Sequence, residues 1–432
     1  MLAYNTRIPT PPGATFESTA DSLYNDPVNF VTNLVNTYGD IVHLPFGERE
    51  LYLVNNPSYV RELFIGKPEF FGKRQDEAAE QSYLDQIAGF VPLFDPANTP
   101  KYIPIVSAAV SRADQRWLAG YSQSDPFVVN MHKEIMQITL EIVAELLYQA
   151  NIQADSASLV DDILTLDFGY GFDPIGANLG AIMPPRVITE SEASKEARAR
   201  LLAAFRRVVD EHSYSEGTFL SGLKNALGAE TAANVALSIA LSMHEVTATT
   251  LTWTWCLLAQ NPEAEARLHA ELAATQQGRP VSYEDALNLP YTSMALDEAR
   301  RLYPSVWIIA RYARSDVSLG EYTIPANAIV LASQWLLHHD ARFFPDPYKF
   351  DPQRWTAEAQ AQLPEFAYFP FSAGPRQCAG LWFAPAQDVV VLGTLAQRWQ
   401  ARLEEGQVLE PIQWRSSIPR YGIQMRLIKR AE

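Results

Sequence analysis

The stretch FSAGPRQCAG, from Phe371 to Gly380, sets a cysteine in an unusual frame. Cys378 is one of only two cysteines among 432 residues, and it lies between Gly-Pro-Arg-Gln and Ala-Gly. The glycines at positions 374 and 380 allow tight turns and a close approach of the backbone to a ligand. The apolar segment 381–399 that follows is predicted to be a helix, and the positive end of its dipole would stabilise a thiolate at Cys378.

A thiolate in this frame is a candidate metal ligand, because it is a strong, soft donor that nearby backbone N–H groups can tune. Zinc is poorly supported, since no second cysteine or histidine lies at ligand spacing. One thiolate with open coordination positions fits a heme iron better. A lone cysteine is more often a small buried apolar residue, and this is the role we predict for Cys256, between Trp255 and Leu257.

Composition restricts the class of protein. Two cysteines cannot form a disulfide framework, and the N-terminal segment has no charged and apolar leader, so we expect a soluble, cytoplasmic protein without a membrane anchor. The net charge of -16 disfavours a nucleic-acid partner, because phosphate binding needs a basic surface. With 47% hydrophobic residues and no repeat or low-complexity linker, the chain is expected to form one domain over residues 1–432.

Hydrophobic periodicity predicts a mainly helical protein with a small β-rich region. Segments 129–149 and 191–213 carry apolar residues at spacings of three and four, which is typical of amphipathic helices. The short segments 41–46 and 51–56 are rich in β-forming residues and predict a small sheet near the N-terminus. Two later segments, 322–333 and 414–430, are each predicted to be a pair of strands.

The longest predicted helix runs from Glu230 to Gln260 without glycine or proline, and it ends at Asn261-Pro262. It is apolar on most faces, so we expect it to be buried. His244 and Glu245 in its middle argue against a membrane span, and burial of an unpaired carboxylate is costly in a soluble protein as well. The midpoint of this helix is therefore a candidate site.

The cysteine segment resembles the FxxGxRxCxG heme-binding loop of the cytochrome P-450 family. All five fixed positions match, and they are Phe371, Gly374, Arg376, Cys378 and Gly380. The resemblance implies the family's mainly helical prism with a small β-rich region, and heme b between the long helix and the cysteine loop. It also implies that Cys378 is the axial ligand of the iron, where electron donation by the thiolate favours O–O cleavage.

Further segments resemble the family in order and separation. EARR contains the ExxR motif as Glu298 and Arg301, which alone would be an ordinary pair on a helix surface. FDPQRW places Arg354 to join them in a buried structural triad. Arg311, in IIARYARSD, falls where the family uses a basic residue to meet a heme propionate.

A second propionate-binding element of the family is not found. Family members carry a tryptophan or histidine followed four residues later by arginine, near segment 96–111 of this chain, and that pair is absent. Lys101 or Tyr102 is the nearest substitute. Propionate binding is therefore expected to depend mainly on Arg311 and Arg376.

The long helix departs from the family at the oxygen-activating motif, which corresponds to SMHEVT at residues 242–247. Glu245 matches the acid of the motif, whereas Met243 replaces a glycine. Val246 replaces the threonine whose hydroxyl supports proton delivery, and an isopropyl group cannot hold a proton-relaying water. A neighbouring hydroxyl could substitute, directly or through a helix distortion, and the candidates are Thr247, Thr249 and Thr250.

The resemblance implies a monooxygenase that oxidises a hydrophobic small molecule with electrons from a separate ferredoxin or flavoprotein. The candidate pocket residues are Phe90, Met243, Trp307 and Ile418. Val246 leaves an alternative open, namely peroxide-driven oxidation, oxidative cyclisation or coupling, desaturation or isomerisation. A heme enzyme that rearranges a peroxide without an electron donor, and a heme-binding carrier or sensor, are rival classes.

Overall fold

The computed structural model describes residues 11–13, 26–46, 49–73, 78, 81, 89–122, 126–169, 190–212, 218–413 and 416–430. Its helices are α2 (Pro27–Tyr38), α3 (Pro57–Arg61), α5 (Thr99–Gly120), α6 (Met131–Tyr148), α7 (Ser156–Gly169), α9 (Glu192–His212), α10 (Phe219–Gln260), α11 (Pro262–Thr275), α12 (Tyr283–Ala286), α13 (Pro290–Leu302), α14 (Gln334–His338), α15 (Ala357–Gln360) and α16 (Phe383–Arg398). Its strands are β1 (Ile41–Phe46), β2 (Arg49–Val54), β3 (Phe71–Gly72), β4 (Phe127–Asn130), β5 (Ile309–Ala313), β6 (Val317–Leu319), β7 (Tyr322–Ile324), β8 (Ile329–Ala332), β9 (Trp399–Leu403), β10 (Pro411–Gln413), β11 (Ser417–Pro419) and β12 (Gln424–Lys429).

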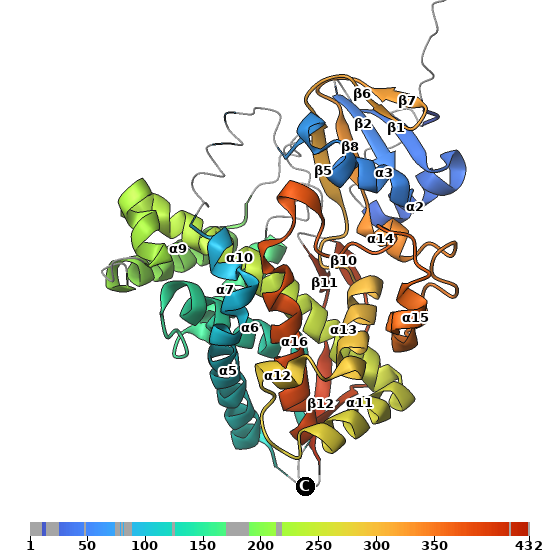
Figure 1. The fold of residues 1–432 in the computed structure, drawn as a ribbon. Helices are drawn as coiled ribbons and strands as arrows, with labels where there is room; N and C mark the ends of the chain where they lie inside the picture. The colour runs from blue at the N-terminus through green and yellow to red at the C-terminus, as the bar shows by residue number, and fades with distance from the viewer. Residues whose placement is uncertain are drawn as a thin grey trace, which may run out of the picture.

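Helices form most of the molecule, and the largest sheet lies at one end of it (Figure 1). This sheet has five strands in the order β1-β2-β8-β5-β3. β1 and β2 form an antiparallel hairpin, which confirms the small sheet predicted from segments 41–46 and 51–56. β2 then pairs in parallel with β8, and β8 pairs antiparallel with β5. Pairing of β5 with β3 brings a strand from the middle of the chain against the N-terminal region.

Both predicted strand pairs after residue 320 are wrong in their pairing. Segment 322–333 contains β7 and β8, but β7 pairs with β6 while β8 joins the five-stranded sheet. Asn327 lies between them with a φ of +67°, so the chain is redirected instead of closing a hairpin. In segment 414–430, β11 pairs with β10, and β12 lies between β4 and β9. Alternation along a strand is local, whereas the choice of partner depends on distant segments.

α10 is the central helix of the fold and packs against α6, α9 and α13. It begins before the predicted Glu230, and Gly228, with φ +76° and ψ +161°, is the residue within it that leaves helical geometry. Helical geometry then continues to Gln260, so the helix distortion considered near residues 242–250 does not occur. Tyr148 of α6 donates a hydrogen bond of 2.6 Å to the Ala236 carbonyl and ties the two helices together.

α10 is also the one helix in the described part of the chain that is long and apolar enough to cross a membrane. Length and composition alone do not separate such a span from a core helix. His244 is fully buried and Glu245 is 3% exposed in the middle of α10, among packed helices, as in the core of a folded domain.

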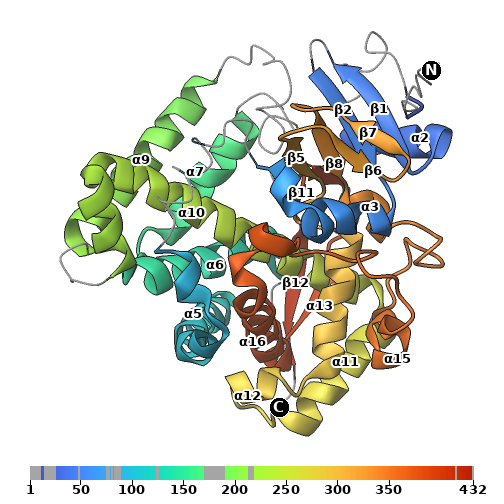
Figure 2. The same cartoon turned by 45° about the horizontal axis from the view of Figure 1, so that its top comes forward.

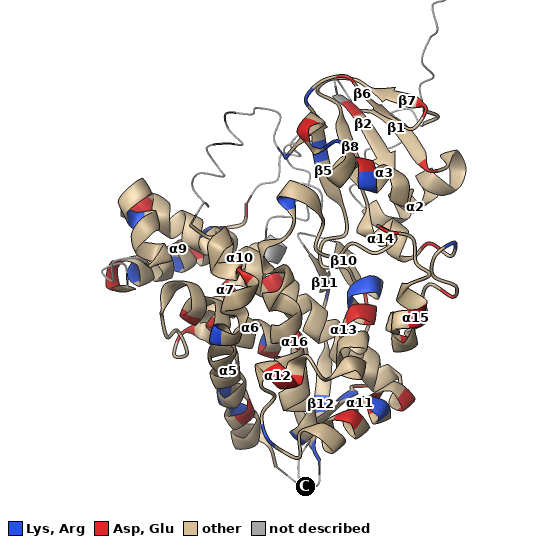
Figure 3. Cartoon of the chain, viewed as in Figure 1, with Lys and Arg blue, Asp and Glu red and all other residues tan. Residues whose placement is uncertain are grey.

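Acidic and basic residues are interspersed along the outer helices α9 and α11 (Figure 3).

Candidate active site

The cysteine loop holds Cys378 between two single 3₁₀ turns, Gly374–Arg376 and Ala379–Leu381. The Cys378 N–H donates to the Phe371 carbonyl at 2.9 Å, and the Cys378 carbonyl accepts from Leu381 N–H at 3.3 Å. α16 begins two residues after the second turn and lies beside α13 (Figures 1 and 2). The backbone on both sides of the sulfur is therefore fixed by the loop itself.

The two cysteines differ sharply in their surroundings. The side chain of Cys378 is exposed, whereas Cys256 is 1% exposed within α10. Burial raises the pKa of the Cys256 thiol to about 12. Surrounding protein atoms raise the pKa of Cys378 as well, but the Gly380 N–H and the charge of Lys73 oppose that shift. Cys378 is accessible to a ligand and has groups that favour its thiolate, so it is the cysteine that can coordinate a metal.

Gly374 is required where the cysteine loop crosses the N-terminal region. Its φ is +70°, and an added Cβ would lie 2.0 Å from the Phe64 carbonyl oxygen. Phe64 belongs to the π-helical turn Glu62–Gly66, which packs against the loop. Glycine thus allows a backbone conformation that other residues rarely adopt and a contact that no Cβ permits.

We expect Gly374→Ala to lower the unfolding midpoint and the heme content of the purified protein. The positive φ alone costs about 1–3 kcal/mol for a residue with a Cβ, and the clash with Phe64 adds to it. Gly406→Ala is a matched control, because Gly406 has a φ of +75° and no atom within 4 Å of an added Cβ. Equal midpoints for the two variants would contradict the close packing of loop and turn.

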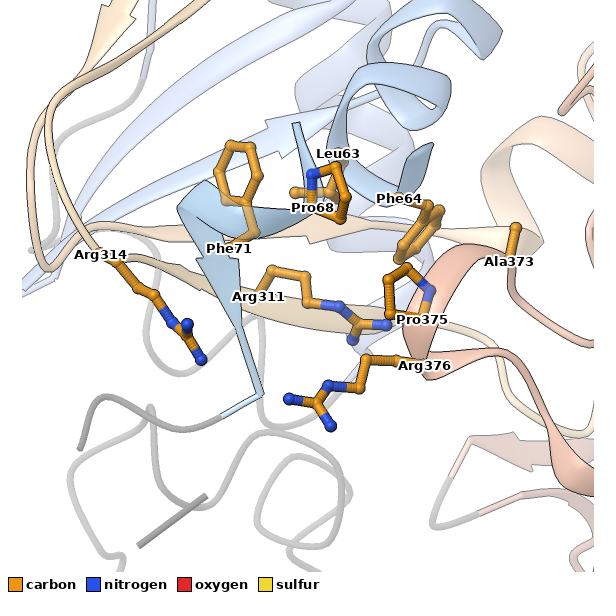
Figure 4. Close-up of a pocket in the computed structure, with 9 residues that line it drawn as sticks. All are labelled: Leu63, Phe64, Pro68, Phe71, Arg311, Arg314, Ala373, Pro375 and Arg376. Atoms are coloured by element: carbon orange, nitrogen blue, oxygen red, sulfur yellow. The ribbon is translucent and has the colours of Figure 1, made fainter. Parts of the chain in front are cut away.

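Three arginines converge on a pocket beside the cysteine loop (Figure 4). Arg311 comes from β5, Arg376 from the cysteine loop, and Arg314 from the chain just after β5. Arg311 is 4% exposed, and its guanidinium carbon lies 4.9 Å from the centre of the Phe64 ring. The structure therefore brings the two predicted propionate-binding residues together and adds a third cation.

Arg314 was missed by sequence reasoning, although it follows Arg311 by three residues in IIARYARSD. Alternation along a strand would have placed the two side chains on opposite faces. The strand ends at Ala313, however, and the Arg314 N–H donates to the Phe70 carbonyl at 2.8 Å. Arg314 lies just beyond the end of the strand, and its side chain lines the pocket.

The structure does not bring Lys101 and Tyr102 to the arginine pocket. Both lie in the first turn of α5, whose N-terminal end is tied to the preceding turn 91–94. Lys101 Nζ donates to Asn98 Oδ1 at 2.8 Å, and Tyr102 Oη donates to the Leu93 carbonyl at 2.9 Å. The Tyr102 ring also makes an edge contact with Phe383 of α16, so it contributes to packing between helices.

Glu298, Arg301 and Arg354 form a buried ionic group. Glu298 and Arg301 are fully buried, and their Oε1 and Nη2 atoms are 2.8 Å apart. Arg354 Nε lies 3.3 Å from the same carboxylate oxygen. Glu298 also accepts from Trp355 Nε1 at 3.0 Å, while Arg301 donates to three backbone carbonyls, those of His338, Pro347 and Lys349.

A second buried ion pair, which sequence reasoning missed, joins α13 and α16 next to the cysteine loop. Arg300 Nη2 lies 2.5 Å from Asp388 Oδ2, and both side chains are almost fully buried. The Arg300 guanidinium also lies over the ring of Phe371, with its carbon 5.7 Å from the ring centre. Burial raises the pKa of Asp388 to about 6, although the charge of Arg300 opposes this. EARR gives no local sign that Arg300 pairs with a residue 88 positions later.

The middle of α10 has an accessible stripe of the partly exposed residues Ile239, Met243 and Val246, and the exposed Ser238 and Ser242 lie beside it. The neighbouring Glu245 is 3% exposed and Thr247 is 6% exposed, so they point away from this stripe. Val246 therefore occupies the accessible face that a relay hydroxyl would need. Thr249 also points elsewhere, because its hydroxyl lies 2.7 Å from Ser416 Oγ in a fully buried contact.

The four candidate pocket residues fall into two groups. Met243 and Phe90 are partly exposed, and Phe90 packs against Phe94 and Phe219. Trp307 is fully buried and Ile418 is 2% exposed, so neither offers a surface to a substrate, contrary to expectation. Trp307 instead fills the core under the five-stranded sheet, and Ile418 pairs with Ile412 in the β10–β11 ribbon.

The residues around Cys378 fit a heme. An accessible thiol suits an axial iron ligand, and guanidinium groups at one edge suit propionate carboxylates. At the edge with the arginines, the loop backbone has no side chain at Gly374, where it packs closely against Phe64. Across the fold, the accessible stripe of α10 offers apolar side chains to a flat, largely apolar cofactor.

Comparison with known proteins agrees with this fit. A model of the cytochrome P-450 family matches residues 215–426. The chain is 28% identical over 414 residues to cyclooctatin synthase of Streptomyces melanosporofaciens, with 89% of this chain and 88% of that protein covered. It is 25% identical over 418 residues to pentalenene oxygenase of Streptomyces avermitilis, with 89% of each covered.

A solved structure, retinoic acid-bound cyanobacterial CYP120A1, has the same fold. It aligns with a TM-score of 0.79 at 22% identity and covers 98% of this chain and 100% of its own. Fold, cysteine loop and relatives agree, and they identify a heme-dependent oxidoreductase with an axial cysteine thiolate. The chain belongs to the cytochrome P-450 family.

Proposed function

We propose that this monooxygenase hydroxylates or otherwise oxidises a polycyclic isoprenoid, with Cys378 as the axial ligand. The observation that carries the cofactor assignment is the accessible Cys378 thiol, on the same loop as Arg376 of the arginine pocket. Two relatives support the substrate class, since their names specify cyclooctatin and pentalenene, which are terpenoids. A cytoplasmic location stays a prediction.

Each side of the site would have a separate task. Cys378 would hold the iron, while Arg311 and Arg376 would bind the propionates through charge-assisted hydrogen bonds. When bound, heme supplies thiolate-assisted cleavage of the O–O bond of dioxygen. The apolar side chains of Met243, Val246 and Phe90 would orient the substrate and exclude water from it.

Electrons would come from a separate ferredoxin or flavoprotein that docks on the face beneath Cys378. Trp382, four residues after the cysteine, is 60% exposed. An exposed tryptophan is a common anchor in protein interfaces. Glu245, the buried acid beside Val246 in α10, points away from the stripe, so it would transfer protons to the site through intervening groups.

The alternative with specific support is chemistry that needs less proton relay. Val246 has no hydroxyl and lies on the accessible stripe of α10, and α10 shows no distortion that would bring Thr247 or Thr249 there. Peroxide-driven oxidation, oxidative cyclisation or coupling, and isomerisation are the reactions that this residue favours. Turnover with hydrogen peroxide but without any electron donor would support this alternative.

Optical titration of the ferric holoenzyme tests the substrate class. We expect pentalenene, or another polycyclic sesquiterpene or diterpene hydrocarbon, to shift the heme from low to high spin, and palmitic acid to leave it unchanged. Met243→Trp should weaken isoprenoid binding about tenfold or more, which corresponds to about 1.4 kcal/mol, because it fills the accessible stripe.

Leu287→Trp adds the same bulk at a residue that is 67% exposed and lies outside the site, so it serves as the control. Its titration should match that of the unmodified protein. A spin shift with palmitic acid alone would contradict the isoprenoid class and favour a fatty acid. Equal weakening of isoprenoid binding by the two tryptophan variants would show that Met243 does not line the pocket.

A further inference from the structure

Two hydroxyl groups meet at the backbone carbonyl of Val246. Thr250, one turn later on α10, donates from Oγ1 to this carbonyl at 3.1 Å. Ser305, in the segment between α13 and β5, donates from Oγ to the same oxygen at 2.9 Å. The two hydroxyl oxygens are 3.5 Å apart. The residue that lacks a relay hydroxyl in its side chain thus gathers two hydroxyls on its backbone.

The hydrogen bonds to the Val246 carbonyl determine which kind of group the hydroxyls of Thr250 and Ser305 can bind in addition. A serine or threonine hydroxyl has one proton to donate and two lone pairs that accept. Each proton is directed at the Val246 carbonyl, which also accepts the helical N–H of Thr250, so three donors share this one oxygen. The oxygen atoms of Thr250 and Ser305 are then left as acceptors. Their next partner must be a donor, such as a water molecule or a substrate hydroxyl.

Exposure separates Ser305 from otherwise similar hydroxyls nearby. Ser305 is partly exposed, next to the partly exposed Val246, and Thr250 is 4% exposed. Thr254 donates to the Thr250 carbonyl at 2.7 Å, and Ser417 donates to the Pro304 carbonyl at 2.7 Å. Both of these are fully buried. Helix and loop are therefore anchored by buried hydroxyls, whereas Ser305 lies at the edge of the accessible stripe.

We propose that Ser305 and Thr250 together hold a water molecule on the accessible stripe of α10, in place of the hydroxyl that Val246 lacks. The water donates one proton to the pair and keeps its second O–H for the site. This inference rests on the proposed function, because the water serves proton delivery only if the heme lies against this stripe. It makes Ser305, outside the oxygen-activating motif, a residue of the proton path.

Infrared spectroscopy of the ferrous holoenzyme with carbon monoxide as the probe tests the proposal without a substrate. In the unmodified protein, a water that donates toward carbon monoxide lowers the C–O stretching frequency, and exchange into D₂O shifts the band. Ser305→Ala and Thr250→Val should each raise the frequency and abolish most of the D₂O shift. Ser305→Thr, which keeps the hydroxyl, should keep the original band.

Thr254→Val and Ser417→Ala are matched controls, since each deletes a hydroxyl that donates to a backbone carbonyl in the same two segments. Both should retain the D₂O-sensitive band. A D₂O-sensitive band that survives in Ser305→Ala and in Thr250→Val overturns the proposal, and so does its loss in the two controls. If either Ser305→Ala or Thr250→Val fails to fold, the other variant still tests the water site.

The same variants separate this inference from the proposed function. The absorption maximum of the ferrous carbon monoxide complex, which reports a thiolate ligand, is recorded for each variant. If the unmodified protein lacks this thiolate maximum, the assignment of Cys378 as the iron ligand is rejected, but the water site is not. With a substrate found by titration, Ser305→Ala should lower product formed per electron pair about tenfold or more and release hydrogen peroxide instead. Adding Val246→Thr to Ser305→Ala should restore most of that loss, whereas a merely structural role for Ser305 predicts no rescue.

Discussion

Replacing Cys378 by alanine should remove the thiolate signature of the heme and abolish turnover supported by dioxygen. The change deletes the accessible sulfur and leaves the surrounding backbone bonds in place, because these run through the Cys378 N–H and carbonyl. Arg311 and Arg376 still offer their charges at the propionate edge, so some heme should remain bound. The measurement is the ferrous carbon monoxide spectrum, together with the heme content of the purified protein.

Cys256→Ala is the control for this prediction. Its thiol is buried in α10, and the raised pKa of about 12 keeps it protonated. Removing it leaves a small cavity, which should lower stability slightly and leave the spectrum unchanged. A thiolate spectrum that persists in Cys378→Ala, or that disappears in Cys256→Ala, would show that the wrong cysteine has been assigned.

The cysteine loop could be predicted from the sequence because its constraints are local. The two short turns around Cys378 lie within ten residues, and glycine at position 374 allows the φ of +70° between them. The helices α6, α9 and α16 were predicted for the same reason. Their apolar residues recur at the spacing of one helix face, and no distant partner is needed to establish it.

Apart from the contacts that the family resemblance implied, features that depend on pairing between distant segments were not predicted. β8 joins β2 and β5 although local alternation favoured pairing with β7, and β12 lies between β4 and β9. The Arg300–Asp388 pair and the Ser305 bond to Val246 join residues 88 and 59 positions apart. No pattern within one segment encodes such contacts, because each side chain has an ordinary alternative role on a surface.

Burial divides the candidate pocket residues. An apolar residue in a predicted site segment can face either the cavity or the core, and sequence does not separate the two. Met243 lies on the accessible stripe, whereas Trp307 is fully enclosed by the core under the sheet. Large aromatic side chains stabilise a core most when they are fully buried, which explains the position of Trp307.

Glu298→Gln should destabilise the protein strongly, by about 3–5 kcal/mol. The substitution keeps the shape of the side chain but leaves the fully buried Arg301 without its counter-charge. Glu298 also accepts from the Asp351 N–H at 3.0 Å and from Trp355 Nε1 at 3.0 Å. The amide nitrogen of glutamine would face donors on either side. The measurement is the denaturant midpoint of unfolding, followed together with heme release.

Glu192→Gln is the matched control, because Glu192 and Lys195 form an ion pair with the same separation of three residues. These side chains are 83% and 48% exposed, so water screens the pair and its loss should leave the midpoint unchanged. Equal midpoints for Glu298→Gln and Glu192→Gln would show that the buried group contributes no more than a surface pair.

A double variant, Glu298→Leu with Arg301→Leu, separates two roles of Arg301. One role is to balance the charge of Glu298, and the other is to hold nearby backbone carbonyls by hydrogen bonds. Replacing a buried ion pair by apolar residues is often neutral for stability. Arg301, however, donates to the carbonyls of His338, Pro347 and Lys349, and these lose their donor in the double variant. We therefore expect only partial recovery of the midpoint, with heme still released early. Full recovery would mean that Arg301 serves Glu298 alone and does not hold the chain between α14 and the cysteine loop.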